Sequence, residues 1–401
     1  MNTKVSQSLK IIISHAYQEV EYYRSLFDEH GIDESGILTM HDFAKIPLLT
    51  FDEVQKSEGR FLAEKYQFFP WIEKLELRRS SSSSGYMTKV YWDCDDNDNS
   101  NKPLANFRNR WYEIPASSKV CSFFGTIYVG NKLSPDKDNF SSRNGKHLFL
   151  HQGGLTDDKI KDYLAKMSDF EVDWLHLRPS VALLLAETIK RHQLPIPKSL
   201  KYIELTGELL QDEHEALLKE VFQVELAYLY SSGEFNSIAF GCKHNNLHVL
   251  EDNVVVEIIK DGKAVIGEAG EICITSLTNH AMPLLRLMTG DIGILTETQC
   301  PCGAKTPILQ LIESRPCEFV TTESGRKISN CVLESIVEQT NEFMARAIRK
   351  FRIIQRESGI LDVELSLKPA YINWGDAIKK EFLANIEEPE LSQAKWNFIF
   401  N

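Results

Sequence analysis

The sequence predicts an α/β protein with a large N-terminal lobe, in which a parallel α/β layer is joined to an antiparallel β region, and a small ferredoxin-like (βαββαβ) C-terminal lobe. Three observations lead to this fold class. Strand-like and helix-like segments alternate over 156–229, short strands follow one another over 247–295, and the last part of the chain has its own strand–helix pattern. We therefore expect domains at 1–315 and 316–401.

The N-terminal part of the large lobe is predicted to begin with helices. Apolar residues recur at helical spacing from Val5 to Phe27, so residues 1–75 are expected to form a helical entry segment. Beyond it, β-branched and aromatic runs predict strands, whereas residues 93–102, dense in Asp and Asn, predict a polar loop. The strands expected here are 90–92, 120–129 and 147–150.

The rest of the chain supplies the two β layers and the small lobe. In the α/β layer we expect helices 156–167, 179–193 and 213–222 with strands 174–177, 202–205 and 225–229. The antiparallel strands are 247–250, 254–259, 270–275, 284–287 and 292–295, and Asp261-Gly262 is a strong hairpin signal. The small lobe is expected as strand 317–321, helix 331–340, strands 348–355 and 361–367, helix 374–386 and strand 396–400.

Composition narrows the class of partner. The 401 residues include 57 acidic and 45 basic side chains, a formal net charge of -12, which argues against nucleic acid or an anionic membrane as the main partner. A small-molecule partner is the default. No window approaches the ~18 apolar residues of a membrane helix and no signal peptide is recognised, so we expect a cytoplasmic protein whose eight Cys are reduced.

A run of five serines is the first candidate site. Ser80 to Ser84, followed by Gly85, offers hydroxyl and backbone N–H donors that suit an anion such as phosphate. The alternative is a flexible serine linker. The Gly-Lys-Ser/Thr ending of a Walker loop is absent.

Three further turns carry acidic or basic side chains. Tyr230-Ser231-Ser232-Gly233-Glu234 and Thr206-Gly207-Glu208 each follow a predicted parallel strand, where a carboxylate could face a metal–nucleotide. Thr289-Gly290-Asp291 could accept hydrogen bonds from a ribose diol, and Arg315 could reach a sugar or phosphate. The alternative for the Asp291 turn is a hairpin with a solvated carboxylate.

Taken together, these segments resemble the adenylate-forming superfamily of acyl-coenzyme A synthetases, most closely its phenylacetate–coenzyme A ligase-like branch. The resemblance covers nearly the whole chain, from Tyr22-Tyr23-Arg24 and Ile46-Pro47-Leu48-Leu49-Thr50 to the stretch ending at Thr289-Gly290-Asp291. It implies a phosphate loop at Ser80, Ser81, Ser83, Ser84 and Gly85, and a turn beside adenine at Gly207 and Glu208. It further implies a magnesium ligand at Glu234 beside Tyr230 and Ser231, a ribose ligand at Asp291, and Arg315 before the hinge of a rotating small lobe.

The resemblance implies ATP-dependent adenylation of a carboxylic acid, followed by thioester formation with coenzyme A. Lys395 is the match to the family's near-terminal catalytic Lys, and Arg78, Arg79, Arg286 and Arg315 would concentrate positive charge for ATP. An aromatic acid would lie between the walls Phe123, Phe124, Tyr230 and Phe235. One rival passes the acyl group to a carrier-protein or protein thiol. Another, suggested by Ser82 and Tyr86, is a binding-only homologue. A homodimer is one option for assembly.

The cysteines include one cluster with metal-ligand character. Cys242 with His248, and Cys300 with Cys302, could close a tetrahedral zinc site across two β loops. Similar ligases often carry the same pattern in this region, so the resemblance implies a structural zinc. His244 is the competing nitrogen ligand, and the alternative is buried reduced thiols with a surface His.

Overall fold

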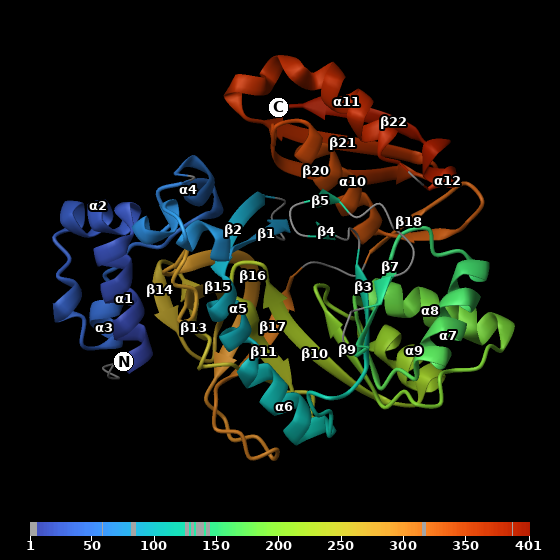
Figure 1. Ribbon diagram of the computed structural model, residues 1–401, viewed down its shortest axis with the longest axis horizontal. Coiled ribbons are helices and arrows are strands. Elements are labelled where there is room, and N and C mark those ends of the chain that lie inside the picture. The colour runs from blue at the N-terminus through green and yellow to red at the C-terminus, as the bar shows by residue number, and fades with distance from the viewer. Residues whose placement is uncertain are drawn as a thin grey trace. The chain divides into compact units, whose positions relative to one another are not determined.

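A computed structural model describes residues 6–57, 59–81, 86–124, 128–129, 132–133, 140–141, 145–314, 318–386 and 388–401. By internal contacts the chain divides into two units, and each is built from two separate stretches of sequence (Figure 1). Unit 1 comprises Met1–Glu113 and Tyr228–Ser314, and unit 2 comprises Ile114–Ala227 and Arg315–Asn401. The division into lobes 1–315 and 316–401 stays a prediction.

Unit 1 begins with helices, as predicted, and the helical spacing that ends at Phe27 is divided between two of them. Val20 ends the first helix and begins the second in an extended conformation (φ -119°, ψ 115°), which turns the chain. The helices of this unit are α1 (Gln7–Glu19), α2 (Glu21–His30), α3 (Met40–Phe43), α4 (Phe51–Lys56), α5 (Cys94–Ser100) and α6 (Lys102–Tyr112), with short 3₁₀ turns η1 (Glu34–Gly36), η2 (Glu64–Gln67) and η3 (Trp71–Lys74).

The strands of unit 1 are antiparallel. β1 (Leu75–Ser81) and β2 (Met87–Asp93) form a separate pair, and the others follow the order β14-β13-β15-β16-β17-β12-β11-β10. The predicted hairpin turn is confirmed, because Asp261 and Gly262 both have positive φ between β13 and β14. The strands are β10 (Glu225–Ser232), β11 (Asn236–Gly241), β12 (Leu247–Val249), β13 (Val254–Lys260), β14 (Lys263–Val265), β15 (Ala269–Ser276), β16 (Leu287–Thr296) and β17 (Ile308–Glu313).

Two local predictions in unit 1 are wrong. The polar stretch 93–102 is helix α5 and the start of α6, because the Asp93 carboxylate caps the helix by accepting from the Asp95 backbone N–H at 2.8 Å. The expected strand 284–287 is not extended, since Arg286 has a positive φ of 53°. Its backbone N–H instead donates to the Thr275 hydroxyl at 2.8 Å.

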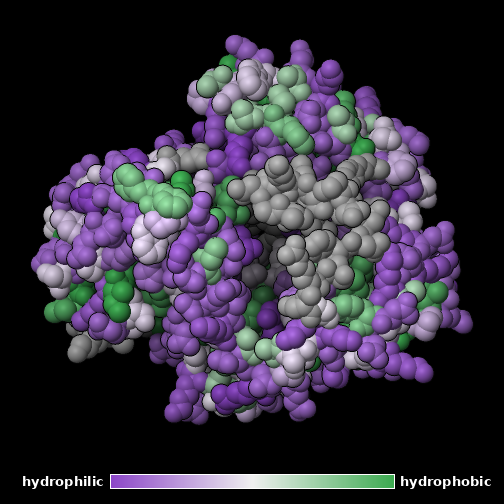
Figure 2. Space-filling view, in the orientation of Figure 1, coloured by the Kyte–Doolittle hydropathy of each residue, from purple (hydrophilic) through white to green (hydrophobic). Residues whose placement is uncertain are grey.

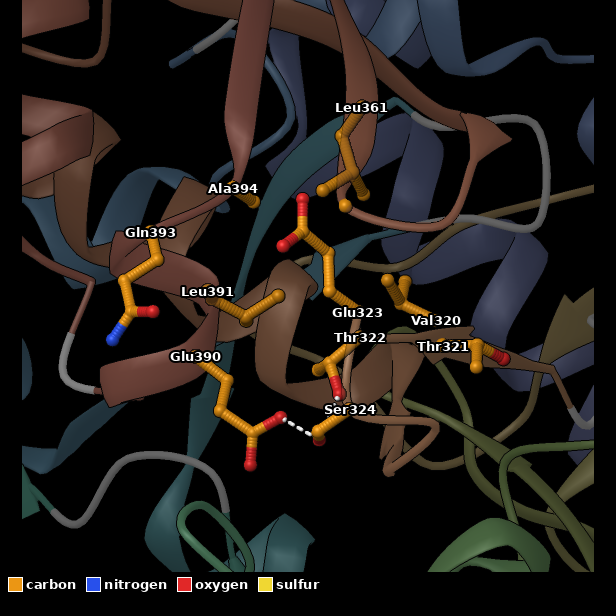
Figure 3. A pocket seen from close by; sticks show the side chains of 11 residues that line it. Val320, Thr321, Thr322, Glu323, Ser324, Leu361, Glu390, Leu391, Gln393 and Ala394 are labelled. Carbon is orange, nitrogen blue, oxygen red and sulfur yellow. Dashed lines mark hydrogen bonds between the residues drawn. The ribbon is translucent and has the colours of Figure 1, made fainter.

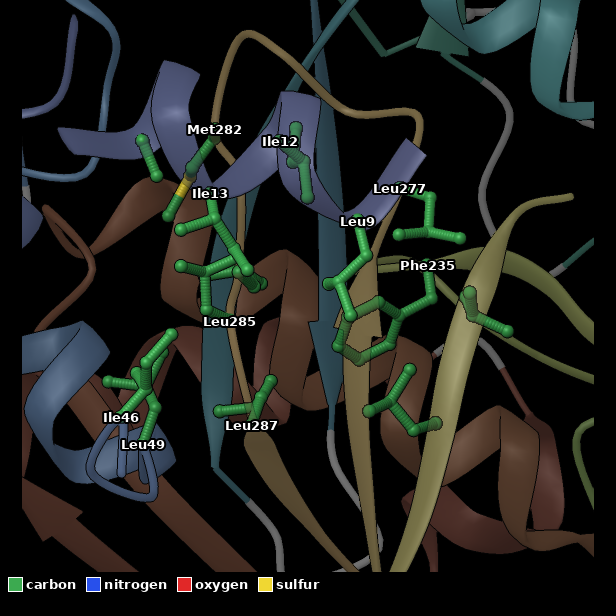
Figure 4. Close-up of a cluster of buried hydrophobic side chains, with 14 of the residues drawn as sticks. Leu9, Ile12, Ile13, Ile46, Leu49, Phe235, Leu277, Met282, Leu285 and Leu287 are labelled. Carbon is green, nitrogen blue, oxygen red and sulfur yellow. The ribbon is translucent and has the colours of Figure 1, made fainter. Parts of the chain in front are cut away.

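A hydrophobic core joins the entry helices of unit 1 to its β strands. Figure 4 shows Leu9, Ile12 and Ile13 of α1 beside Leu285 and Phe235, all fully or nearly fully buried. Each such side chain contributes about 1.5–3 kcal/mol through removal of apolar surface from water. The entry helices are therefore part of the folded core of unit 1.

Unit 2 contains the predicted parallel α/β layer. Strand order is β9-β8-β3-β7-β6, with parallel pairing of β9 to β8, β8 to β3 and β3 to β7. The elements are β3 (Val120–Phe124), β4 (Tyr128–Val129), β5 (Lys132–Leu133), β6 (Phe140–Ser141), β7 (His147–His151), α7 (Asp157–Phe170), β8 (Trp174–Leu177), α8 (Pro179–His192), β9 (Tyr202–Thr206) and α9 (Asp212–Phe222).

The C-terminal part of unit 2 has the predicted order of elements. Its first strand, however, pairs with an extra strand in a separate hairpin, β18 (Phe319–Thr321) with β19 (Lys327–Ser329), while β20, β21 and β22 form a three-stranded sheet. The remaining elements are α10 (Asn330–Phe343), β20 (Ile348–Glu357), β21 (Ile360–Leu367), η4 (Pro369–Trp374), α11 (Gly375–Ala384), α12 (Pro389–Ser392) and β22 (Lys395–Phe400).

The surface agrees with the acidic, polar composition. Figure 2 shows mostly hydrophilic residues on one face, with apolar residues scattered in small groups. Among the described residues, none of the helices combines the length and apolar character needed to span a bilayer.

Candidate functional site

Glu234 lies in the turn between β10 and β11, and β2 fixes that turn. The Thr88 hydroxyl donates to Oε1 of Glu234 at 2.9 Å, and the Trp92 indole N–H donates to the Gly233 carbonyl at 3.0 Å. Glu234 is only 2% exposed, and among the described residues no cationic side chain pairs with it. A buried carboxylate with one hydroxyl donor is costly, so this geometry suits a bound cation.

Asp291 and Tyr230 form a second polar pair in unit 1. The Tyr230 hydroxyl donates to Oδ2 of Asp291 at 2.6 Å, which joins β10 to β16. The other carboxylate oxygen, Oδ1, is buried and has no hydrogen-bond partner among the described residues. Since buried polar atoms are nearly always paired, Oδ1 is suited to accept from a ligand hydroxyl.

The surroundings of Tyr230 determine the protonation state of its phenol. Burial and then the neighbouring Asp291 carboxylate raise the pKa of Tyr230 well above its usual value, so the phenol stays protonated and acts as a donor. Ser231 faces Ser237 across the β10–β11 pair. The hydroxyl of Ser232 is buried without a partner among the described residues, a further polar atom available to a ligand.

The serine run is described only at its start. Ser80 and Ser81 end β1, opposite Thr88 and Met87 of β2. The register therefore places the start of the run on the same hairpin as the Glu234 partner Thr88. Ser82, Ser83, Ser84 and Gly85 lie outside the described residues, as does Arg315.

Glu208 belongs to unit 2 and has a different environment. It follows Gly207, whose φ of +86° favours glycine, and its carboxylate accepts from the backbone N–H of Ser180 at 2.8 Å and the Ser180 hydroxyl at 2.9 Å. Burial raises the pKa of Glu208, while Arg178, with Nη1 at 3.7 Å from Oε1, opposes that rise. The Ser180 donors also lie at the N-terminus of α8, which favours the carboxylate.

The aromatic residues predicted to line an acid pocket have separate positions. Phe235 lies in the unit 1 core next to Leu9 and Leu277 (Figure 4), and core packing alone explains it. Phe123 belongs to unit 2, where it is buried with its ring centroid 6.0 Å from that of Tyr163. Phe124 ends β3 opposite His151, and its side chain lies outside the described part of the structure.

The structure describes the positions of two basic residues that the sequence predicted for the site, Arg286 and Lys395. Arg286 is buried, donates to the Glu257 carboxylate at 3.0 and 3.1 Å, and donates to the Ala44 carbonyl at 2.8 Å. We correct the expectation that it supplies charge for ATP, because its buried guanidinium is already paired with Glu257 and with two backbone carbonyls, those of Ala44 and Ile46. Lys395 is the exposed first residue of β22, in register with Ile360.

Cys242, His248, Cys300 and Cys302 come together in unit 1. Their ligand atoms lie within 4.8 Å of one another, with Cys242 Sγ 3.7 Å from Cys300 Sγ and Cys302 Sγ 3.2 Å from His248 Nε2. In a tetrahedral zinc site with Zn–S bonds of ~2.3 Å, two sulfur ligands lie about 3.8 Å apart. The distance between Cys242 Sγ and Cys300 Sγ agrees with this value, so the donor set fits zinc. His244, the competing nitrogen ligand, does not belong to the cluster.

Hydrogen bonds around the sulfurs support a ligand role. Although burial opposes it, hydrogen bonds, including those from the Cys302 backbone N–H and the Asn246 amide, lower the pKa of Cys300 below its usual value. The backbone N–H of His244 donates to Cys242 Sγ at 3.4 Å, and that of Ala304 to Cys302 Sγ at 3.4 Å. His248 Nδ1 lies 3.4 Å from the Thr306 carbonyl oxygen, which would orient the ring.

A pocket of about 330 Å³ lies within the C-terminal part of unit 2 (Figure 3). The β18–β19 hairpin, β21 and the α12–β22 turn form its walls, and the Ser324 hydroxyl donates to Glu390 at 2.6 Å across it. No residue predicted for the functional site lines this pocket.

Thr88 and Trp92 were not predicted as site residues from the sequence. Thr88 follows the serine run and lies two residues before the buried Val90, so strand alternation indicates an inward side chain. Nothing local connects it with Glu234, 146 positions further along the chain.

Comparison with known proteins shows what this chain resembles. No protein-family model matches the sequence. The phenylacetate-coenzyme A ligase of Thermus thermophilus is 25% identical over 375 residues, 90% of this chain and 79% of that protein. The Escherichia coli phenylacetate-coenzyme A ligase is 25% identical over 304 residues, 72% of this chain and 65% of its own length.

Solved structures agree on the fold. The crystal structure of 2-hydroxyisobutyryl-CoA ligase in the thioesterification state matches 98% of this chain and 85% of its own, with a TM-score of 0.63 and 17% identity. The same ligase in the postadenylation state gives a TM-score of 0.61 over 98% of this chain and 84% of its own. The chain is therefore similar in sequence to phenylacetate-coenzyme A ligases and shares the fold of the adenylate-forming acyl-coenzyme A ligases, which are AMP-forming acid–thiol ligases.

Proposed function

We propose that this protein activates a small carboxylic acid with ATP and transfers the acyl group to coenzyme A. A carboxylate oxygen of the acid attacks the α-phosphorus, and the bond to pyrophosphate breaks. The thiol sulfur then attacks the acyl carbon, AMP leaves with the bonding electron pair, and the thiol proton passes to solvent. One observation carries the proposal: unit 1 buries two carboxylates, Glu234 and Asp291, whose polar requirements its own residues leave incomplete.

Each carboxylate has a distinct part. Glu234 would hold magnesium, which when bound screens the phosphate charge during transfer. Thr88 engages only Oε1 of Glu234, so the hydroxyl orients the carboxylate and leaves Oε2 for the cation. Asp291 would accept from the ribose hydroxyls with the buried Oδ1, while Tyr230 holds Oδ2 in place. Ser80, Ser81, Ser83, Ser84 and Gly85 would donate to the phosphates, with Gly207, Ser231 and Arg315 in the proposed nucleotide set.

An aromatic acid is the finer proposal. The similar Thermus and Escherichia proteins are named for phenylacetate, and the aromatic rings of Phe123 and Tyr163 pack together near the end of β3. A hydroxylated aliphatic acid is the substrate in the name of the structurally similar ligase. Both classes therefore belong in the acid panel.

The test is product analysis over acids and acceptors. Aromatic, phenylalkanoic and short aliphatic acids are incubated with ATP, Mg²⁺ and coenzyme A, and thioester and AMP are separated by chromatography. Equal yields of acyl-coenzyme A and AMP support the proposal. AMP formation with transfer only to a purified carrier protein would favour the rival acceptor. ATP binding with neither product would leave the binding-only homologue.

We also propose that the cluster of Cys242, His248, Cys300 and Cys302 holds a structural zinc ion. The ion would join the β11–β12 turn to the loop between β16 and β17, since the cluster draws on both. Four protein ligands close the coordination shell, which is typical of a structural and not a catalytic zinc site.

Metal analysis of protein purified without chelator tests the zinc proposal. We expect about one zinc per chain, and a loss of most of it in His248→Ala. His244→Ala is the matched control, because His244 lies on the same turn outside the cluster and should leave zinc content unchanged. Zinc-free wild-type protein with a normal melting temperature would refute the site.

A further inference from the structure

Five polar side chains of unit 2 meet at the N-terminus of α8, and we call them the Arg178 cluster. Arg178, Ser180 and Glu208 come from the α/β layer, whereas Ser329 and Glu334 come from β19 and α10 of the C-terminal part. Arg178 Nη2 lies 2.9 Å from Glu334 Oε2, and the hydroxyls of Ser180 and Ser329 are 2.6 Å apart. The cluster is thus a direct contact between 114–227 and 318–401.

One guanidinium in the cluster serves two carboxylates. Arg178 lies 2.9 Å from Glu334 but 3.7 Å from Glu208, whose side chain is 1% exposed. The guanidinium stabilises the ionised form of both carboxylates, whereas the two carboxylates repel each other as like charges. If Glu334 left, Arg178 would still have Glu208 as a partner. Opening this contact therefore leaves no lone buried charge on the α/β layer.

The hydroxyl pair of Ser180 and Ser329 can also separate without leaving a polar group unpaired. Ser180 and Ser329 are both fully buried, and Ser180 also donates to Glu208. If the C-terminal part moved away, water could replace Ser329 at Ser180, while the Glu208–Ser180 hydrogen bonds stayed within the α/β layer. The contact is thus built from groups that can be re-satisfied after separation.

We infer that the Arg178 cluster is a releasable latch, in which Glu334 and Ser329 are positioning residues that seat the C-terminal part on the α/β layer for one of two half-reactions. The inference rests on the proposed function in one respect, because a two-step reaction gives a reason for a contact that opens. Glu208 directly follows Gly207, so the latch closes beside the turn proposed for the nucleotide.

A second ion pair between the same two parts provides a matched control. Lys327 Nζ lies 2.9 Å from Glu187 Oε1, with side chains 47% and 35% exposed. The Arg178–Glu334 pair is less exposed, at 24% and 13%. Water screens an exposed ion pair strongly and a less exposed pair less, so losing the Glu334 charge should weaken the contact more than losing the Glu187 charge. The latch predicts unequal effects of neutralising the two glutamates.

The first experiment measures seating without any substrate. In Ser180→Cys/Ser329→Cys protein treated with diamide, we expect a 180–329 disulfide, identified by mass spectrometry of the linked peptides. Adding Glu334→Gln should slow its formation more than about tenfold, and adding Glu187→Gln by less than about fivefold. Glu334→Asp should recover part of the rate. Absence of the disulfide, or equal effects of the two Gln substitutions, would overturn the latch.

The second experiment asks whether the latch must open. The cross-linked protein should lose at least one partial reaction, either acid-dependent ATP–pyrophosphate exchange or thioester formation from acyl-adenylate, and dithiothreitol should restore it. Full retention of both would overturn the functional role. If no acid supports either reaction in wild-type protein, the proposed function fails, yet the cross-linking rates still decide the contact.

Discussion

The carboxylates of the two units differ in what holds them. In unit 1, Glu234 and Asp291 are fixed by the neutral hydroxyls of Thr88 and Tyr230, all within the same unit. In unit 2, Glu208 shares the Arg178 guanidinium with Glu334 from a distant part of the sequence. Unit 1 therefore presents preorganised acceptors, and unit 2 presents a contact that can exchange partners.

This difference separates two tasks within one family fold. A carboxylate held only by a hydroxyl is suited to a cationic or hydroxyl-bearing ligand, because among the described residues no cationic side chain pairs with it. A carboxylate that shares a cation with a second carboxylate is a poor ligand. Such a contact can open, however, because the cation keeps one partner when the other carboxylate moves away. We expect the largest effects from substitutions that disturb the fixed groups of unit 1, and smaller effects elsewhere.

The largest effect should come from the buried ion pair that supports unit 1. Replacing Arg286 with Met leaves Glu257 without a cation and frees the Ala44 carbonyl. We expect the free energy of unfolding to fall by about 3–5 kcal/mol. Urea denaturation measures it, and Arg78→Met, whose Glu76 partner is exposed, should change it by less than about 1 kcal/mol. Equal changes would refute a structural role for Arg286.

The next effect concerns the fixed carboxylate Glu234. Glu234→Gln keeps the shape of the side chain and the Thr88 hydrogen bond but removes the charge. We expect acid-dependent activity to fall by about 100-fold or more, with an unchanged circular dichroism spectrum. Glu268→Gln, on an exposed glutamate of the same unit, is the control. Activity within threefold of wild type would remove Glu234 from the site.

A smaller effect is expected at the ribose position. Asp291→Asn removes a charged acceptor, so the KM for ATP should rise about tenfold, as a lost hydrogen bond to a charged group predicts. Tyr230→Phe should change it less, because Asp291 keeps its charge and loses only the donor at Oδ2. An unchanged KM in both variants would contradict ribose binding by Asp291.

The smallest effect is a pH dependence in the entry helices. Burial lowers the pKa of His15, whose Nε2 lies 2.8 Å from the His280 carbonyl oxygen, and the titratable side chains that face it are those of His280, Lys65 and Glu19. Because the folded state favours the neutral ring, this contribution is complete above about pH 6.5 and is lost as pH falls below it. Between pH 7.5 and 5.5, His15→Gln should lose about 1–2 °C less melting temperature than wild type. An equal fall in melting temperature in the two proteins would exclude His15 as a source of the pH dependence.

The sequence predicted the order of strands and helices because each depends on local periodicity. The alternation over 156–229 and the Asp261-Gly262 turn both appear in the structure. Prediction from local composition was wrong where buried polar contacts determine the secondary structure. The stretch 93–102 is helical because Asn97 and Ser100 turn inward and accept hydrogen bonds from the amide of Asn236, which composition cannot reveal.

Site chemistry was predictable only for residues within a recognisable turn. Glu234, Asp291 and the Cys/His cluster lie in short motifs, and the structure gives each a buried polar setting or a convergent geometry. The partners Thr88 and Arg178 were missed, because they contact residues far away in the sequence. Arg286 was misread for the same reason, since its partner Glu257 lies on another strand.

Acid-dependent exchange of labelled pyrophosphate into ATP by the wild-type protein tests adenylation most directly. The exchange needs only the first half-reaction, so it does not depend on the identity of the thiol acceptor. We predict exchange that requires Mg²⁺ and saturates with at least one aromatic or short aliphatic acid. Binding of ATP without exchange, at saturating concentrations of every acid in the panel, would contradict the proposal that the unit 1 carboxylates serve adenylate formation.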